Sequence, residues 1–408
     1  MGRFQFPTHH IINEDEILFD SAKSLFTELH GEQLYLTYGF KEISMIYGDV
    51  EKSFSKTKTL INRIRHQEKE GTPLKSLHNQ TKKEGKKINE AIEQKASSIL
   101  NENQFTLEGK PKEKNSQYSS KKMITLTSDE VQKAIDEVKE TLEKAHDVTK
   151  NPVPYENPEN TVNISIDDVL VKKQNEKRSD KNEQKPNDRK YIHNTIIHIH
   201  KKKKSYVLNS INSVGGLRLV IAFLISNMLL INNLLFFVDG QRSLQSAIIN
   251  AFSWFGKIRL ILDWYHLDKK CKQLLSLALK GKKYRNKVLE QLTPLLWLGL
   301  VDEAITYLNS LDENWIKDKS AIEKLIGYFE RNRLWIPCYA VRKKLGLRNS
   351  SNIGEKMNDL VVSDRQKHNG MSWSKSGSLA LASLTTLKKN NEFSNWFKNK
   401  KLNFKLAA

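Results

Sequence analysis

The sequence predicts an α/β core with a mixed sheet and an all-α insertion, preceded by an all-α region. Short β-branched and aromatic runs alternate with helical patterns between about residues 162 and 279, which is typical of strands connected through helices. From there to about residue 347, and also in the first hundred residues, apolar residues recur at helical spacing. We therefore expect a helical region at 14–100, a flexible linker at 101–160 and a core at 161–408, with the insertion at about 280–347.

The helical region at 14–100 has the pattern of a helix-turn-helix DNA-binding unit. Apolar residues recur at helical spacing from Ile17 to Leu29 and from Phe40 to Ile64, and Gly71-Thr-Pro then marks a break. The next helix is rich in side chains that can hydrogen-bond to base edges in the major groove. The candidates for contact with double-stranded DNA are Lys75, His78, Asn79, Gln80 and Lys82. An ordinary surface helix of mixed polarity is the alternative.

The segment 101–160 is polar and poor in aromatic residues, and it contains a lysine-rich stretch and a cluster of prolines. This composition predicts a flexible linker. Within the linker we expect one capped helix, with Thr127 or Ser128 as its cap.

The core is expected to contain three strands, a helix, a strand, a helix, a strand and a helix, in that order. The strands are predicted at 162–166, 191–200, 205–208, 234–238 and 259–263, and residues 174–189 form a charged turn. This is the order of a ribonuclease-H-like fold, in which the first and fourth strands are neighbours. The apolar run at 217–238 approaches the length of a membrane span. Arg218 and three asparagines would be costly in lipid, so we expect a helix, a turn and a strand, and no membrane partner.

Three acidic residues predict a metal site. Asp167 and Asp239 each follow an apolar run that is expected to be a buried strand, and Glu355 lies beside a cluster of polar and basic residues. Three carboxylates can hold two hard divalent cations, which activate a nucleophile and stabilise the leaving oxygen of a phosphodiester. Strand alternation alone does not decide between Asp167 and its neighbour Asp168 as the first ligand. The alternative for each aspartate is an exposed turn residue at the end of a strand.

Other candidate residues surround these three. Asp263 and His266 are candidates to ligate metal or contact DNA, and the alternative is that Asp263 caps a helix while its aromatic neighbours pack. Trp373 is a candidate to stack on an unpaired base, with burial against a helix as the alternative. His198 and His200 share a strand face, but a zinc site needs further ligands, so an exposed strand is expected there. The candidates for phosphate contacts are Arg365, Lys367 and Lys375.

The charge of the chain suits a polyanionic partner. The 67 Lys and Arg residues exceed the 47 Asp and Glu residues and give a formal net charge of +20 over 408 residues. Such a charge implies salt-sensitive binding, and DNA, RNA or an anionic membrane surface would each fit. Cys271 and Cys338 are the two cysteines, too few for a disulfide framework, and no signal peptide is expected. A reduced cytoplasmic compartment is therefore expected.

Four motifs together resemble the acidic-triad (DDE) transposases of bacterial insertion sequences, in particular the Mutator-like branch with a helical insertion. They are Ser-Ile-Asp167-Asp, Phe-Phe-Val-Asp239-Gly-Gln-Arg, Leu-Asp-Trp-Tyr-His266-Leu, and Gly-Glu355 followed by Arg365-Gln-Lys-His-Asn-Gly-Met-Ser-Trp-Ser. The resemblance covers about residues 160 to 385. The family has glycine after the first acid, where this sequence has Asp168.

The resemblance implies a DNA transposase with a ribonuclease-H-like core and catalytic residues Asp167, Asp239 and Glu355. It implies two Mg²⁺ ions, with Mn²⁺ as a substitute, and hydrolysis at the ends of the element followed by strand transfer into target DNA. It also implies a homo-oligomer on double-stranded DNA and a nucleoid-associated location in the cytoplasm. A nuclease or resolvase with the same metal chemistry is the nearest alternative. A non-catalytic DNA-binding protein, such as a decayed copy, is an alternative from another class.

Overall fold

The structure is a computed structural model, and it describes most of the chain. The described residues are 10–13, 16–20, 29–30, 34–35, 41–45, 53–64, 73–113, 121–142, 146–149, 153–174, 191–367 and 371–406. The predicted charged turn at 174–189 lies outside these residues from 175 onward.

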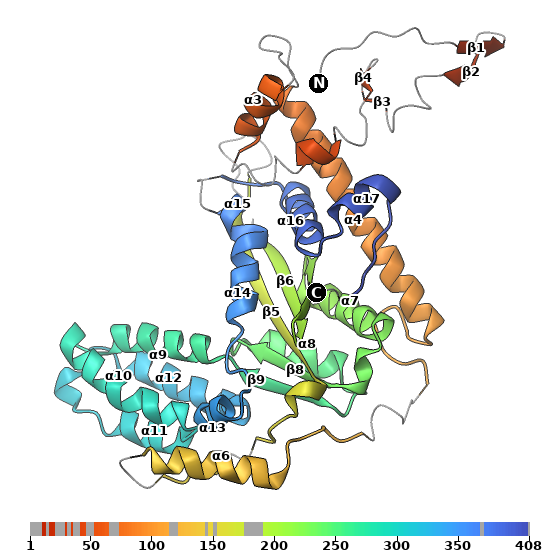
Figure 1. The fold of residues 1–408 in the computed structure, drawn as a ribbon. Coiled ribbons are helices and arrows are strands. Elements are labelled where there is room, and N and C mark those ends of the chain that lie inside the picture. Colours follow the sequence, from red (N-terminus) through yellow and green to blue (C-terminus); the bar gives the residue numbers. More distant parts are fainter. Residues whose placement is uncertain are drawn as a thin grey trace.

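A five-stranded mixed sheet forms the centre of the fold (Figure 1). Its order is β7-β6-β5-β8-β9. β5, β6 and β7 pair antiparallel, whereas β8 pairs parallel with β5 and β9 pairs parallel with β8. The strands are β5 (Thr161–Lys172), β6 (Tyr191–Lys201), β7 (Lys204–Ser210), β8 (Asn233–Val238) and β9 (Ile258–Leu262). The predicted strands are therefore confirmed, as is the neighbouring position of the first and fourth strands.

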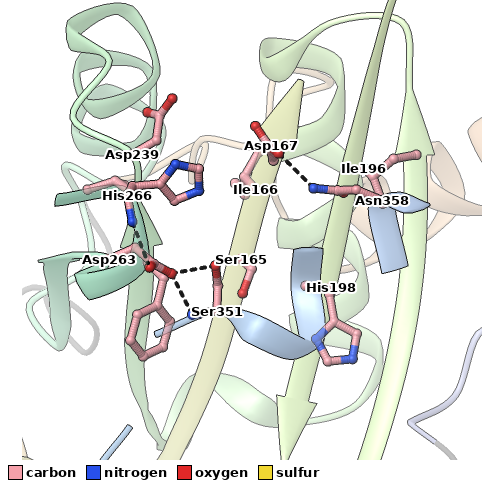
Figure 2. A pocket seen from close by; sticks show the side chains of 13 residues that line it. Ser165, Ile166, Asp167, Ile196, His198, Asp239, Asp263, His266, Ser351 and Asn358 are labelled. Carbon is pink, nitrogen blue, oxygen red and sulfur yellow. Dashed lines mark hydrogen bonds between the residues drawn. The ribbon is translucent and has the colours of Figure 1, made fainter. Parts of the chain in front are cut away.

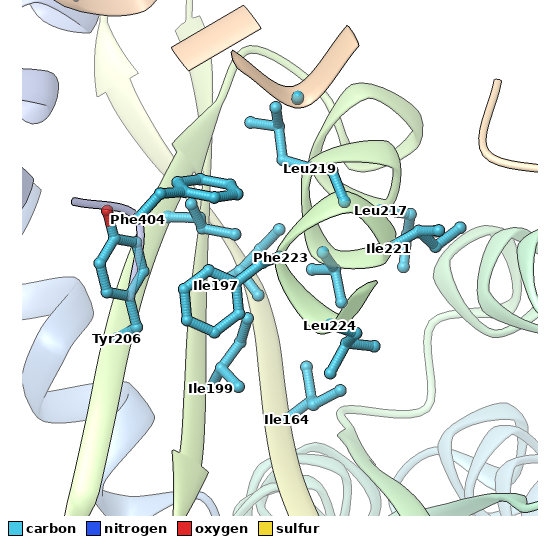
Figure 3. Close-up of a cluster of buried hydrophobic side chains, with 14 of the residues drawn as sticks. Ile164, Ile197, Ile199, Tyr206, Leu217, Leu219, Ile221, Phe223, Leu224 and Phe404 are labelled. Carbon is cyan, nitrogen blue, oxygen red and sulfur yellow. The ribbon is translucent and has the colours of Figure 1, made fainter. Parts of the chain in front are cut away.

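Two helices make the crossovers that parallel strands require. α7 (Ser213–Ser226) leads into β8, and α8 (Arg242–Ala251) leads into β9. α7 is almost wholly apolar and packs against one face of the sheet, where Phe223 and Leu224 are fully buried (Figure 3). Phe223 stacks on Tyr206 of β7 with ring centroids 4.5 Å apart. Each such side chain contributes about 1.5–3 kcal/mol by leaving water.

The predicted helix, turn and strand at 217–238 are confirmed by α7 and β8. β8 is buried along its whole length, which explains its unbroken apolar sequence. Among the described residues, no helix combines the length and apolar character needed to cross a bilayer.

α4 (Leu74–Glu102) is a long helix that packs along α7 and α16 (Lys375–Lys389) (Figure 1). Ile88, Ala96 and Leu100 of α4 are fully buried in the main core. A Cβ atom at Gly85 would lie 2.4 Å from Ala380, so the two helices touch at a position where only glycine fits. α4 is therefore part of the core, and not a helix of a separate N-terminal unit.

The N-terminal region is not all-helical, which corrects the prediction. α3 (Phe54–Ile64) is a helix as expected, but short strands occur earlier in the chain. They are β1 (His10–Asn13), β2 (Glu16–Asp20), β3 (Leu29–His30) and β4 (Leu34–Tyr35). β1 pairs antiparallel with β2. Short runs such as Ile17-Leu-Phe satisfy a helical and an extended pattern equally, and pairing with a second apolar run favours the strand.

The expected linker is folded over much of its described length. α6 (Ser128–Glu140) is the predicted capped helix, and Thr127 forms a capping box with Glu130. The buried face of α6 packs against α13 (Tyr339–Lys344). Glu156 is buried and forms an ion pair with Arg342 of α13. The prediction of a flexible linker is therefore wrong for these parts, because their few apolar residues are concentrated on one face.

The helical insertion lies beside the sheet (Figure 1). Its buried apolar residues form a second core together with residues of α9 (Trp264–Ala278), β8 and β9. The helices of the insertion are α10 (Lys282–Trp297), α11 (Val301–Asn309), α12 (Lys319–Asn332) and α13, which follow α9. The predicted all-helical character of residues 280–347 is confirmed. The chain then returns to the sheet through α14 (Asn352–Asn358), a π-helix (η5, Asp359–Ser363) and α15 (Asp364–Gln366), and it ends with α16 and α17 (Phe393–Asn399).

Candidate active site

A small pocket lies where α14 crosses β5 and β6 beside the end of β8 (Figure 2). Residues from five separate segments of the chain line this pocket. They are Ser165, Ile166 and Asp167 of β5, Ile196 and His198 of β6, Phe237, Val238 and Asp239 at the end of β8, Asp263 and His266 after β9, and Ser351, Gly354 and Asn358.

Asp167 lies within β5, opposite Ile196 of β6, and does not end the strand as the sequence predicted. Its Oδ2 accepts a hydrogen bond of 2.7 Å from Asn358 Nδ2, and its Oδ1 accepts one of 2.9 Å from the Asp168 N–H. Burial raises the pKa of the Asp167 carboxyl above its ordinary value. His266 opposes this shift in pKa, whereas the negative charge of Asp239 adds to it.

Asp168 points away from this pocket. It is exposed, and its Oδ1 accepts a hydrogen bond of 2.5 Å from Thr195 Oγ1. Strand alternation places Asp168 on the face opposite Asp167. Asp167, and not Asp168, therefore shares the pocket with Asp239 and His266.

Asp239 begins a tight turn directly after β8. Its Oδ1 accepts a hydrogen bond of 2.9 Å from the Gln241 N–H, and Gly240 has a left-handed φ of 87°. Tyr328 of α12 donates its hydroxyl to the Asp239 carbonyl oxygen at 2.9 Å. A Cβ atom at Gly240 would lie 2.5 Å from the Tyr328 ring. The turn that presents the Asp239 carboxylate is therefore held by the helical insertion.

The carboxylate of Asp263 is occupied by internal hydrogen bonds. Oδ1 accepts from the N–H groups of Tyr265 and His266 at the start of α9, and Oδ2 accepts from the N–H and the hydroxyl of Ser351, each at 2.5 Å. A carboxylate has about four acceptor positions, so all are filled. Asp263 is 1% exposed. The structure confirms the alternative that Asp263 caps the helix and contradicts its assignment as a DNA contact.

His266 occupies the first turn of α9 and lines the pocket. In Figure 2 its imidazole lies between the side chains of Asp239 and Asp167. His266 and Asp167 line the same pocket, and the charge of the imidazole lowers the pKa of the Asp167 carboxyl. Trp264, two residues earlier, packs against Trp297 with ring centroids 4.7 Å apart, as the packing alternative predicted.

Glu355 belongs to α14, but its side chain lies outside the described part of the structure. Its backbone position precedes Asn358 by three residues, so these two positions fall on one face of the helix, whereas Ser351 directly precedes the helix. Gly354, which immediately precedes Glu355, is so close to β5 that a Cβ atom would lie 2.7 Å from Ser165. Among the described side chains, no group of three or more His, Cys, Asp or Glu is placed to share a metal ion.

Two of the predicted nucleic-acid contacts after Glu355 are buried. Arg365 is 4% exposed, and its guanidinium lies over the rings of Phe54 and Trp373, 4.9 and 5.3 Å from their centroids. Trp373 donates its ring N–H to the Gln366 carbonyl oxygen at 3.1 Å. The predictions for Arg365 and Trp373 as DNA contacts are wrong for this conformation, because both side chains form the core under α3. Lys367 and Lys375 are exposed, so their predicted role stays open.

The five candidate DNA contacts on α4 differ in their exposure. Lys75 and Asn79 are exposed, and His78 and Lys82 are half-buried. Burial, with Lys82 and Arg365 nearby, lowers the pKa of His78. Gln80 is 5% exposed and donates to Ser76 Oγ at 3.1 Å, so it cannot reach a base edge. Its prediction as a DNA contact is wrong because that face of α4 packs on the core.

His198 and His200 do not lie on an exposed strand, which corrects that expectation. His198 is 3% exposed, and His200 contacts the guanidinium of Arg348 at 3.2 Å. Burial lowers the pKa of both imidazoles to about 4, and the positive charge of Arg348 adds to the shift. At neutral pH both rings are therefore uncharged.

Sequence reasoning missed three residues that shape the site, namely Tyr328, Ser351 and Asn358, and it placed His198 on an exposed strand. Ser350-Ser-Asn before a helical pattern is a capping signal. That signal does not show that Ser351 bonds to a carboxylate 88 positions earlier.

No protein-family model matches this chain, and no curated protein is similar to it in sequence.

Proposed function

We propose that this chain is a DNA transposase of the acidic-triad class, which uses divalent metal ions to cut DNA at the ends of an insertion element and to join those ends to target DNA. One observation carries the proposal. Asp167 on β5 and Asp239 after the neighbouring strand β8 line the same pocket, and the charge of one affects the pKa of the other.

The sheet order supports this proposal. A ribonuclease-H-like core needs its first strand beside its fourth, and β5 lies beside β8 in parallel. Such an arrangement brings a residue of one strand next to a residue at the carboxyl end of the other. The helical insertion between β9 and α14 also agrees with the branch that the motifs resemble.

The donor set fits magnesium. Mg²⁺ prefers oxygen ligands, and Asp167 and Asp239 supply carboxylates from rigid positions next to strands. Burial and mutual repulsion disfavour the charged form of Asp167, and a cation between the two carboxylates would relieve this cost. Asp167, Asp239 and Glu355 would hold the two ions, which when bound activate a water or a 3′ hydroxyl and stabilise the leaving oxygen.

The residues of the chain have distinct parts in this proposal. Asn358 orients the Asp167 carboxylate by donating to one oxygen, and it leaves acceptor capacity on both oxygens for a metal ion. His266 lies beside the two carboxylates, where it can contact the scissile phosphate or the attacking group. Of the candidates for phosphate contacts that follow Glu355 in the sequence, Lys367 and Lys375 remain, because both are exposed.

The test uses the purified full chain and a supercoiled plasmid that carries the DNA flanking the gene on both sides. With Mg²⁺ or Mn²⁺, we expect cuts at the outer ends of inverted repeats and joined products, and no product with EDTA. Cutting without any joining would favour a nuclease or resolvase. Metal-independent binding without cleavage would select a non-catalytic DNA-binding protein.

A further inference from the structure

We propose that Asp263 is a positioning residue that fixes the start of α14 against the end of β9, and thereby sets the position of the Glu355 backbone relative to Asp167 and Asp239. This inference rests on the proposed function. Asp263 ligates no metal in this assignment. It acts through the helix that carries the third carboxylate.

The contacts of Asp263 connect two distant parts of the chain. One oxygen caps α9, which opens the helical insertion, and the other holds the backbone N–H and the hydroxyl of Ser351, which directly precedes α14 (Figure 2). A helix cap needs one carboxylate oxygen only. The second oxygen of Asp263 therefore serves the return of the chain from the insertion to the sheet.

The opposite end of α14 is fixed as well. Asn358, its last residue, donates to Asp167, and Gly354 packs on Ser165 without room for a Cβ atom. Immediately after Asn358 the chain forms a π-helix, a local distortion that is frequent at functional sites. Because Glu355 lies between these two attachments, its backbone cannot shift along or away from β5 without breaking one of them.

Further hydrogen bonds around Asp263 strengthen the junction. The Trp264 N–H donates to the Asn349 carbonyl oxygen at 3.0 Å, and Asn349 donates to the Tyr339 carbonyl oxygen at 2.7 Å. The Tyr339 hydroxyl, fully buried, donates to the Leu262 carbonyl oxygen at 2.7 Å. The entry and exit of the insertion are therefore tied together at the edge of the pocket, with the Asp263 carboxylate at the centre.

The experiment measures the affinity of Mn²⁺ for the full chain by calorimetry, with the melting temperature as a check on folding. Asp263→Ser keeps a capping oxygen for α9 but is too short to hold Ser351. We expect it to weaken Mn²⁺ binding by about tenfold or more, the effect typical of groups that orient metal ligands. Asp318→Ser is the matched control, because the Asp318 carboxylate caps α12 by accepting from the Ser320 N–H of its own helix. We expect unchanged Mn²⁺ binding in that variant.

A second pair of variants leaves Asp263 in place. Ser351→Ala removes the hydroxyl donor and should bind Mn²⁺ less tightly than the unmodified chain, whereas Ser351→Thr keeps the hydroxyl and should restore the affinity. This pair decides the question if Asp263→Ser does not fold. Equal affinity in Ser351→Ala and Ser351→Thr would overturn the positioning role.

Asp239→Asn separates a failure of this inference from a failure of the proposed function. If Asp239→Asn weakens Mn²⁺ binding but Asp263→Ser and Ser351→Ala do not, the metal site stands and the positioning role of Asp263 is wrong. If Asp239→Asn also leaves Mn²⁺ affinity unchanged, the proposed metal site itself is refuted.

Discussion

Replacing Glu156 by alanine should destabilise the fold strongly. Glu156 and Arg342 are 2% and 0% exposed at their side chains. The guanidinium donates two hydrogen bonds to the carboxylate, at 2.7 and 2.6 Å, and another to the Arg348 carbonyl oxygen at 2.8 Å. Removing the carboxylate leaves a buried positive charge without its counter-charge, which typically costs about 3–5 kcal/mol.

Two further variants test whether the loss of stability comes from the buried charge of Arg342. Glu159 forms an ion pair with Lys202 at the surface, where the side chains are 69% and 56% exposed. Glu159→Ala should therefore change the free energy of unfolding by less than about 1 kcal/mol. The double replacement Glu156→Leu with Arg342→Met should recover most of the loss, because apolar residues of similar volume often replace a buried ion pair at no net cost.

Urea unfolding followed by circular dichroism and tryptophan fluorescence measures these differences through the midpoint and slope of the transition. The reasoning predicts a large loss for Glu156→Ala, a negligible one for Glu159→Ala and a small one for the double variant. Equal midpoints for the two single variants would refute it, and would mean that the segment before β5 is not anchored to the insertion.

Three other predictions concern the site and the N-terminal region. Asp239→Asn should abolish metal-dependent cutting and joining of DNA while mobility-shift binding is retained, and joining by the variant would exclude Asp239 as a ligand. Asp167 has a folded-state pKa above its ordinary 3.8, so the folded protein holds this proton more tightly and loses stability as pH rises through that pKa. Asp167→Asn should therefore raise the melting temperature at neutral pH, and the gain should disappear as pH falls toward 3.8; a gain that grows on acidification would contradict the assignment. Removing residues 1–40 should preserve the circular dichroism of the fold, whereas removing 1–100 should abolish it because α4 supplies buried core residues; a folded 101–408 fragment would show that α4 is dispensable.

The local sequence pattern was sufficient to predict most of the strands and helices of the core. β-branched and aromatic runs identified the strands, and the apolar period identified the helices of the insertion, because these elements bury a regular face. Thr127 was recognised as a possible cap from residues next to it in the chain. Features of this kind depend on neighbours within a few positions.

The predictions that failed concern residues whose contacts come from distant parts of the chain. Gln80, Arg365 and Trp373 are polar or amphipathic side chains whose partners come from other elements, and polarity alone predicts exposure for them. The burial of His198 depends on α14, about 150 residues later, which covers that face of the sheet. β5 continues beyond Asp167 because β6 pairs with it up to Lys172, a contact that no local pattern shows.

The helical insertion is bonded to each segment that bears a proposed metal ligand. Tyr328 holds the turn that contains Asp239. Arg342 holds Glu156, which lies five residues before the start of β5, the strand that carries Asp167. Asp263, at the entry to the insertion, holds the residue before α14 and Glu355. A displacement of the insertion would therefore move all three carboxylates relative to one another, and metal affinity should respond to changes in its core that lie far from the pocket.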